Sequence, residues 1–148
     1  MTKAVTSAYE EFQQRRTTTA SSRRQTHAER ESVRIAGLCL PHPVGVVIGE
    51  GSVIGTDVTI YQGVTLGRAS HEVDAYPTID DGAVIYAGAT LLGPIRIGRN
   101  AVVAAHSVVL SDVPDFATVV GAPARIVRTS RPDDSLPTAD VGRAASSR

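Results

Sequence analysis

The chain has 148 residues, which at roughly 100 to 200 residues per domain predicts one domain with its own core. Fifteen Lys and Arg residues balance fifteen Asp and Glu residues, which excludes a dedicated nucleic-acid binder. The uncharged stretch 82–95 contains Gly and Pro and is shorter than the roughly 20 residues of a membrane span. Cys39 is the single cysteine and no secretory signal is visible, so we expect a soluble, cytoplasmic protein without an intrachain disulfide.

Both ends of the chain differ in composition from the middle. Residues 1–34 are predicted to be a polar N-terminal arm. Within this arm, residues 7–16 suit a short helix, because Ser7 can cap it and acidic residues precede an Arg pair, as the helix dipole favours. Residues 129–148 have the composition of a disordered C-terminal tail.

Branched aliphatic residues recur at every sixth position between these ends. The series consists of Ile48, Ile54, Ile60 and Leu66 and, after an insertion, of Ile79, Ile85, Leu91, Ile97, Val103 and Val109. A period of six fits neither an amphipathic helix nor a plain strand, but it fits short strands joined by sharp corners. Mainly small or β-branched residues follow four positions later, and Gly, Asn or Asp can supply the unusual backbone angles of the corners.

Three such hexads close one triangular coil. Stacked coils pair their backbones at about 4.8 Å, so the aliphatic side chains form ladders inside the stack. We therefore predict an all-β fold, a parallel β-helix, for residues 35–128; a β-sandwich is the alternative, although its spacing is looser. Ten hexads give a stack of roughly 16 Å. A prism that short has much side surface for its core, which predicts self-association.

Four motifs follow one another along this region: LPHPVGVVIGE (40–50), VTLG (64–67), YPTI (76–79) and VGAPARI (120–126). In their order and spacing, residues 38–127 resemble the bacterial serine acetyltransferases. The resemblance implies a left-handed β-helix that assembles as a homotrimer with clefts between subunits. It also implies acetyl-CoA as co-substrate, no metal, and acetyl transfer to a small hydroxyl acceptor, which for serine is a step of cysteine biosynthesis.

His42 corresponds to the catalytic histidine of the resembled family. A neutral imidazole can take the proton of an alcohol while its oxygen attacks a thioester, so His42 is the candidate general base. Pro41 and Pro43 fix the backbone on both sides of it, which suits a catalytic histidine and equally a structural corner histidine.

The same resemblance assigns candidate cofactor-binding residues, small ones that let the pantetheine chain of CoA lie close to the coil. These are Gly67, Ala87, Gly88 and Ala105. Arg125 is the candidate for the CoA phosphates, with Arg96, Arg99 and Arg128 as further possibilities, because guanidinium groups offer paired donors to phosphate. The small residues also suit the geometry of the repeat itself, and the arginines also suit a solvated surface.

The chain departs from the resembled family on the serine side. Pro41 stands where the family has an aspartate, and Ala75 and Tyr76 replace an Arg-His pair. The aspartate that orients the catalytic histidine has no match, which leaves Glu29 or Glu31 as possible substitutes. Asp74 and Tyr76 are candidate substrate-binding residues, because both can hydrogen-bond a polyol; packing of this loop against a neighbouring subunit is the alternative.

Three functions therefore stay open at this point. The first is an acetyl-CoA-dependent O-acetyltransferase with L-serine as the first named acceptor. The second is a sugar or polysaccharide-precursor O-acetyltransferase, and the third is a catalytically impaired CoA-binding or scaffold protein. A zinc enzyme on the same repeat is disfavoured, because the four histidines are scattered and Cys39 is the only thiol.

Overall fold

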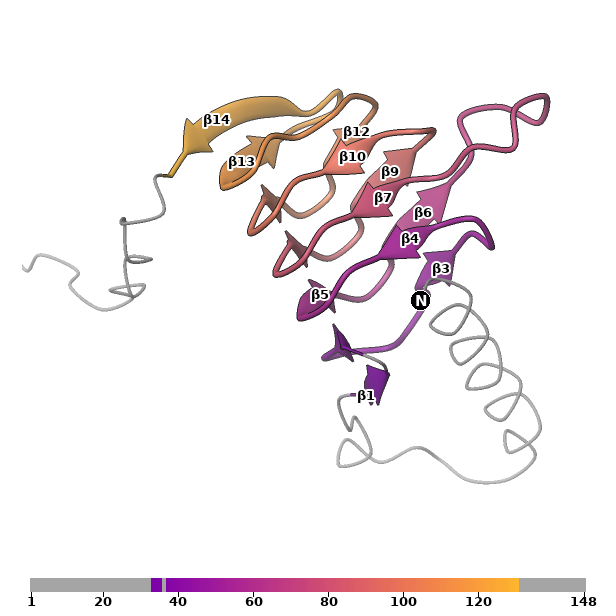
Figure 1. The fold of residues 1–148 in the computed structure, drawn as a ribbon, viewed down its shortest axis with the longest axis horizontal. Helices are drawn as coiled ribbons and strands as arrows, with labels where there is room; N and C mark the ends of the chain where they lie inside the picture. The colour runs from indigo at the N-terminus through magenta and orange to yellow at the C-terminus, as the bar shows by residue number, and fades with distance from the viewer. Residues whose placement is uncertain (1–32, 36, 131–148) are drawn as a thin grey trace, which may run out of the picture.

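The strands of this chain wind into a stack of triangular coils (Figure 1). The structure, a computed structural model, describes residues 33–35 and 37–130, which contain fourteen short strands and no helix. Each complete coil contributes one strand to each of three flat faces. The prediction of an all-β repeat structure is confirmed.

The three faces are three hydrogen-bonded sheets. Sheet A consists of β1 (Val33–Ile35), β2 (Leu38–Leu40), β5 (Val58–Ile60), β8 (Val84–Ile85), β11 (Val102–Val103), β13 (Ala117–Val120) and β14 (Arg125–Thr129). Sheet B consists of β3 (Val47–Ile48), β6 (Thr65–Gly67), β9 (Thr90–Leu92) and β12 (Val108–Val109). Sheet C consists of β4 (Val53–Ile54), β7 (Thr78–Ile79) and β10 (Arg96–Ile97). Successive coils pair in parallel, whereas β1 on β2 and β14 on β13 are antiparallel and lie at the two ends of sheet A.

The interior of the stack is built from the aliphatic residues that recur every six positions. All ten are buried. In sheet B, for example, Ile48 lies opposite Leu66 and Leu66 lies opposite Leu91, so the side chains form a continuous ladder. Each fully buried aliphatic side chain stabilises the fold by roughly 1.5–3 kcal/mol relative to an exposed one.

Corner residues fall into two kinds that the sequence pattern does not separate. Residues with a left-handed backbone lie late in a corner, such as Asp57 with φ 54° and Asn100 with φ 52°. A glycine that directly follows an aliphatic residue is needed for a different reason, namely the space that a Cβ would occupy. A Cβ on Gly55 would lie 2.3 Å from Oδ1 of Asp81, the atom that accepts a 2.8 Å hydrogen bond from the Thr56 backbone N–H. Gly55 therefore makes room for a carboxylate of the next coil.

Three columns of corners run along the prism. The His42 corner, between sheets A and B, comprises residues 41–45, 61–63, 86–88 and 104–106. The loop corner, between sheets B and C, comprises residues 49–51, 67–76, 92–94 and 110–112. The aspartate corner, between sheets C and A, comprises residues 55–57, 80–82, 98–100 and 114–116.

The strands extend slightly beyond the predicted repeat region. Val33 and Arg34, which the sequence assigned to the arm, belong to β1, and Thr129 is the last residue of β14. The predicted helix at 7–16, the candidate carboxylates Glu29 and Glu31, and residues 131–148 lie outside the described residues. Among the residues that are described, no helix has the length and hydropathy of a membrane span.

Candidate active site

His42 lies in a corner that is longer than those stacked on it. Residues 41–45 join the buried Leu40 to the buried Val46, whereas the equivalent corner of the next coil consists of residues 61–63 alone. The two extra residues push this corner outward, and the His42 side chain is exposed. The corner closes on itself through a 2.8 Å hydrogen bond from the Val44 N–H to the His42 carbonyl oxygen. The sequence therefore places the imidazole on the outside of the prism, where a substrate can reach it.

Two tyrosines stand beside His42 on the coils that follow. The ring centroids of His42 and Tyr61 are 6.4 Å apart, with the ring planes tilted by 51°. Tyr61 in turn stacks on Tyr86, with centroids 5.1 Å apart and an angle of 11°. Both tyrosines directly follow ladder residues that lie opposite each other, so their side chains leave the prism at the same corner, one coil apart. Sequence reasoning did not single out either tyrosine, although their equal position in two successive coils is a readable signal.

The His42 corner carries no Asp, Glu, Lys or Arg in any of its four described segments. Its polar groups are the imidazoles, the amide of Gln62 and the phenols of Tyr61 and Tyr86. Among the described residues, His42 forms no ion pair with a carboxylate. The orienting carboxylate that a catalytic histidine often uses is therefore not supplied by residues 33–35 or 37–130.

Three of the four small residues assigned to CoA lie on this corner, above His42. Hydrogen bonds connect its coils: the Gly88 N–H donates to the Gln62 carbonyl and the His106 N–H donates to the Ala87 carbonyl, both at 2.9 Å. Ala87 and Ala105 therefore follow Gln62 up the corner, and their side chains end at Cβ. Gly88 has a different surrounding, because a Cβ there would lie 2.5 Å from Nδ1 of His106. The imidazole of His106 fills this space, and a chain along the corner would pass over that ring.

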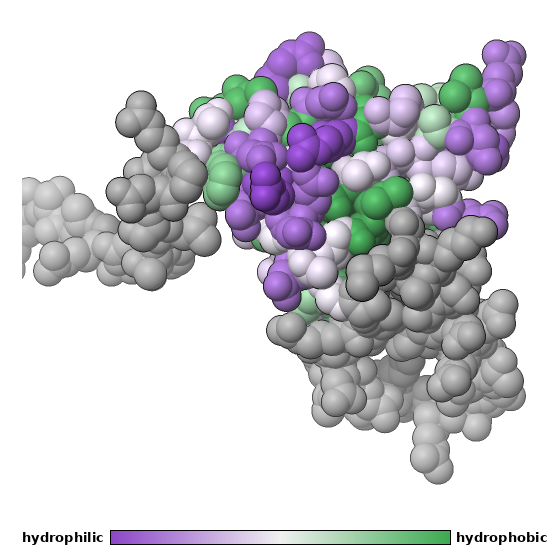
Figure 2. Space-filling view, in the orientation of Figure 1, coloured by the Kyte–Doolittle hydropathy of each residue, from purple (hydrophilic) through white to green (hydrophobic). Residues whose placement is uncertain are grey.

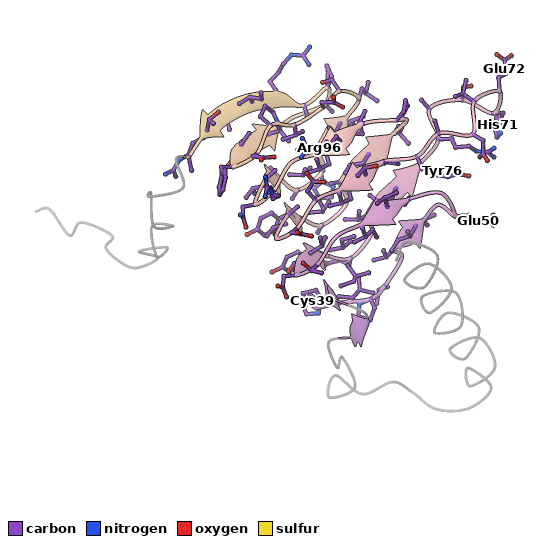
Figure 3. The ribbon with its side chains drawn as sticks, in the orientation of Figure 1. Cys39, Glu50, His71, Glu72, Tyr76 and Arg96 are labelled. Carbon is purple, nitrogen blue, oxygen red and sulfur yellow. The ribbon has the colours of Figure 1, made fainter. Side chains whose placement is uncertain are left out.

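Of the candidate phosphate ligands, Arg125 lies on the same side as this corner. It begins β14 opposite Val120, next to the turn in which the Ala124 N–H donates to the Val108 carbonyl. Arg96 and Arg99 lie elsewhere. Arg96 is on sheet C and pairs with Asp80 and, at 3.7 Å, with Asp115. These charges form part of the hydrophilic surface over β10 (Figures 2 and 3).

Sheet C also carries a hollow. It is an open depression of about 360 Å³ lined by residues of β4, β7 and β10, among them Asp80, Arg96 and Arg99. His42 does not line it. We place the candidate active site at His42 instead, because the basic and acidic groups of the hollow already pair with one another.

The candidate acceptor residues lie on the loop corner. Residues 67–76 form the loop that projects from the prism between β6 and β7, with His71 and Glu72 far out and Tyr76 at its base (Figure 3). The Tyr76 ring lies against the opposite turn, because a Cβ on Gly49 or on Gly51 would come within 2.3 Å of a ring carbon. Asp74 accepts a 3.4 Å hydrogen bond from Arg68.

The acidity of the Tyr76 phenol is perturbed by its surroundings. Burial raises the pKa of Tyr76 above its ordinary value; the Arg68 guanidinium, 5.9 Å from the ring centroid, opposes this effect, and the Asp74 and Glu50 carboxylates reinforce it. The phenol is therefore a neutral hydrogen-bonding group at physiological pH. It is able to bind an uncharged hydroxyl compound.

One chain thus divides the predicted site residues between two columns. His42, Ala87, Gly88 and Ala105 lie on the His42 corner with Arg125 beyond them, whereas Gly67, Asp74 and Tyr76 lie on the loop corner. Sheet B separates these two columns. Among the described residues, no group of three or more metal-binding side chains is found.

The chain is similar in sequence to a known protein family and to several curated proteins. The bacterial transferase hexapeptide family (six repeats) matches residues 76–111. The serine acetyltransferase of Haemophilus influenzae is 50% identical over 92 residues, which cover 62% of this chain and 34% of that protein. The serine acetyltransferase of Bacillus subtilis is 53% identical over 89 residues, which cover 60% of this chain and 41% of that protein. The chain therefore spans roughly a third to two fifths of the length of these relatives.

Solved structures give the same assignment for the fold. A serine acetyltransferase in complex with CoA has a TM-score of 0.57 and 49% sequence identity, covering 61% of this chain and 37% of that one. The serine acetyltransferase of Neisseria gonorrhoeae in complex with serine has a TM-score of 0.59 and 51% identity, covering 62% of this chain and 38% of that one. With the hexapeptide repeat and the parallel sheets, these likenesses confirm the left-handed parallel β-helix.

Proposed function

We propose, from the premise that this chain is a serine acetyltransferase-like hexapeptide-repeat protein, that it transfers the acetyl group of acetyl-CoA to the hydroxyl of a small acceptor. The observation that carries this proposal is the exposed imidazole of His42 in an extended corner, below a column of small residues. Acetyl-CoA is a cytoplasmic metabolite, so we place the protein in the cytoplasm.

His42 is the general base of the proposed reaction. Its neutral imidazole accepts the proton of the acceptor hydroxyl while the hydroxyl oxygen bonds to the thioester carbonyl carbon. The carbon–sulfur bond breaks, and the imidazolium returns its proton to the CoA sulfur. The products are an acetyl ester and free CoA, so the transfer needs no covalent enzyme intermediate.

Ala87 and Ala105 would hold the pantetheine chain of acetyl-CoA, because their short side chains leave the corner open above His42. Arg125 begins β14, which is five strands along sheet A from β2, at about 4.8 Å per strand. One N–H of its guanidinium donates a 3.0 Å hydrogen bond to the Ala124 carbonyl oxygen, and its other N–H groups would bind phosphate oxygens while the thioester lies beside His42. When bound, acetyl-CoA supplies the activated acetyl group. The His42 corner fits this anionic cofactor because its four described segments carry no acidic side chains, which would repel the phosphates.

The complete site requires two copies of the chain. The His42 corner and the loop corner lie on different edges of one prism, so Gly67, Asp74 and Tyr76 of one copy meet His42 only across a subunit boundary. A ring of three triangular prisms brings each such pair of edges together three times. We therefore propose a homotrimer with the active sites in its clefts.

L-Serine is the first acceptor to be tested, because the proteins that this chain resembles are named serine acetyltransferases. O-Acetylserine formation would assign the protein to cysteine biosynthesis. A sugar or polysaccharide precursor is the second candidate, and one observation favours it: the His42 corner offers no charged side chain to the ammonium and carboxylate groups of an amino acid. Release of CoA thiol, measured with serine, homoserine and a panel of sugars, decides between these acceptors.

Replacement of His42 with Ala is the direct test of the proposal. The expected result is a fall in kcat by a factor of roughly 10² to 10⁴, the contribution of general-base catalysis, with the affinity for acetyl-CoA retained. Steady-state kinetics and calorimetric CoA binding measure the two quantities. Wild-type protein that binds acetyl-CoA but releases no thiol with any acceptor of the panel would instead be a CoA-binding or scaffold protein.

A further inference from the structure

An aromatic side chain lies next to the His42 imidazole. Within residues 33–35 and 37–130, the Tyr61 ring lies beside the imidazole, with 6.4 Å between the ring centroids and the ring planes tilted by 51°. Within the same residues, the imidazole nitrogens form no hydrogen bond or ion pair. A base on an exposed corner with several accessible rotamers would spend much of its time turned away from the acceptor. Contact with a fixed ring reduces this freedom.

Tyr61 is itself held in place. Its backbone N–H donates a 2.9 Å hydrogen bond to the Ile85 carbonyl, and its ring stacks on Tyr86 at 5.1 Å and 11°. The parallel pairing of β5 with β8 fixes the spacing of these two rings. Tyr86 is 42% exposed, so the stack forms a wall on the outside of the prism that ends at His42.

We propose that Tyr61, supported by Tyr86, is a positioning residue that holds the His42 imidazole in the orientation for proton transfer. The role of His42 as the base comes from the proposed function, on which this inference rests. Aromatic pairs with centroids between 4.5 and 7 Å shift the balance between two orientations by a factor of roughly two to ten. The electron-rich face of Tyr61 also favours the positive charge that His42 gains when it takes the proton.

The kinetic test uses a pair of substitutions at one position. Tyr61→Leu should lower kcat by roughly two- to tenfold and leave the KM for acetyl-CoA within twofold, whereas Tyr61→Phe, which keeps the ring, should retain wild-type kcat. Thr59→Val, on the same strand, is the matched control for a change in sheet A. Wild-type kcat in Tyr61→Leu, or equal losses in Tyr61→Leu and Tyr61→Phe, would overturn the proposal.

Tyr86 provides a second test, because it acts through Tyr61. Tyr86→Leu should lower kcat by less than Tyr61→Leu does, and the double variant should be no worse than Tyr61→Leu alone. Independent, multiplied losses would mean that Tyr86 has a separate role, which contradicts the support that we assign to it.

Nuclear magnetic resonance separates this inference from the proposed function, since it needs no turnover. The ring current of Tyr61 should displace the imidazole proton signals of His42; Tyr61→Phe should keep this displacement and Tyr61→Leu should remove it. Unchanged imidazole signals in Tyr61→Leu would show that the two rings are not close to each other in solution and would contradict the positioning role. Failure of the acetyltransferase assay with these signals intact would count against the proposed function alone.

Discussion

At the scale of single residues, the tyrosines among the described residues occupy two environments of opposite character. Tyr61 and Tyr86 stack on the exposed side of the His42 corner, while the Tyr76 ring lies over Gly49 and Gly51. Burial in the second arrangement raises the pKa of the Tyr76 phenol. Tyr76 therefore combines two roles, as a packing residue at the base of the loop and as a neutral hydrogen-bonding group of the proposed acceptor site.

The raised pKa of Tyr76 predicts a pH dependence of stability. The folded state favours the neutral phenol, so the stabilisation from this group is fully present below the unfolded-state pKa of about 10 and is lost as pH rises through the folded-state pKa. Above pH of about 10, the wild type should therefore lose stability more steeply than Tyr76→Phe, which keeps the ring and cannot ionise. Urea denaturation between about pH 8 and 11 measures both slopes; parallel curves would contradict the prediction.

The sequence predicts the buried residues of this fold better than the neighbours of its catalytic candidate. The ten aliphatic ladder residues were readable because a buried position in a triangular coil recurs strictly every six residues. The proximity of His42 and Tyr61 could not be predicted from the sequence, for two reasons. The His42 corner has two more residues than the corner stacked on it, which breaks the six-residue period, and the direction of the imidazole depends on the local backbone. The separation of Gly67 from Ala87 also needed the topology, since the six-residue period does not show at which of the three corners a residue lies.

At the scale of strands and corners, each coil is shaped by what the next coil places against it. Gly45, Gly63 and Gly88 are stacked at the His42 corner and all have left-handed backbones, with φ between 64° and 69°. His106 continues this column with φ 57°, and its ring lies over Gly88. A larger residue at Gly88 would therefore be strained twice, by its backbone and by the neighbouring coil.

Gly45 and Gly88 form a matched pair that separates these two costs. A Cβ on Gly45 has its nearest neighbour at 3.7 Å, whereas one on Gly88 would lie 2.5 Å from the His106 ring. Gly45→Ala should destabilise the protein by about 1–2 kcal/mol from its backbone alone, and Gly88→Ala by about 1–3 kcal/mol more from the overlap. Equilibrium urea unfolding measures both values.

Combining His106→Ala with Gly88→Ala tests whether the His106 ring causes the additional loss of stability. The double variant should recover most of the additional loss, because the overlapping ring is gone. Equal destabilisation by Gly45→Ala and Gly88→Ala, or strict additivity in the double variant, would mean that the His106 ring moves aside without cost.

At the scale of the whole molecule, the prism is short and leaves apolar side chains at its surface. Val47, Val53 and Leu110 are exposed at 55%, 40% and 57%, and hydrophobic surface adjoins the hydrophilic surface of sheet C in Figure 2. A core built from narrow coils cannot cover these residues, so we expect copies of the chain to associate and bury them. The division of the proposed site between two corners gives the same expectation from function.

Mixed assemblies test both expectations together. One variant carries His42→Ala, and the other carries Asp74→Ala with Tyr76→Ala, so each chain retains only one intact half of the proposed site. When the two are mixed in equal amounts, unfolded and refolded together, a cleft receives an intact His42 corner with probability one half and an intact loop corner with probability one half. About a quarter of the clefts should then be complete, because these two halves come from neighbouring copies of a closed ring.

The expected result is therefore turnover near a quarter of the wild-type rate, well above that of either parent. The same two variants mixed without unfolding give the control, since folded assemblies that do not exchange chains keep the parental activities. Refolded mixtures that show only the average of the two parents, in spite of a trimeric mass by light scattering, would place both halves of the site within a single chain. That outcome is incompatible with a prism whose sheet B lies between His42 and Tyr76.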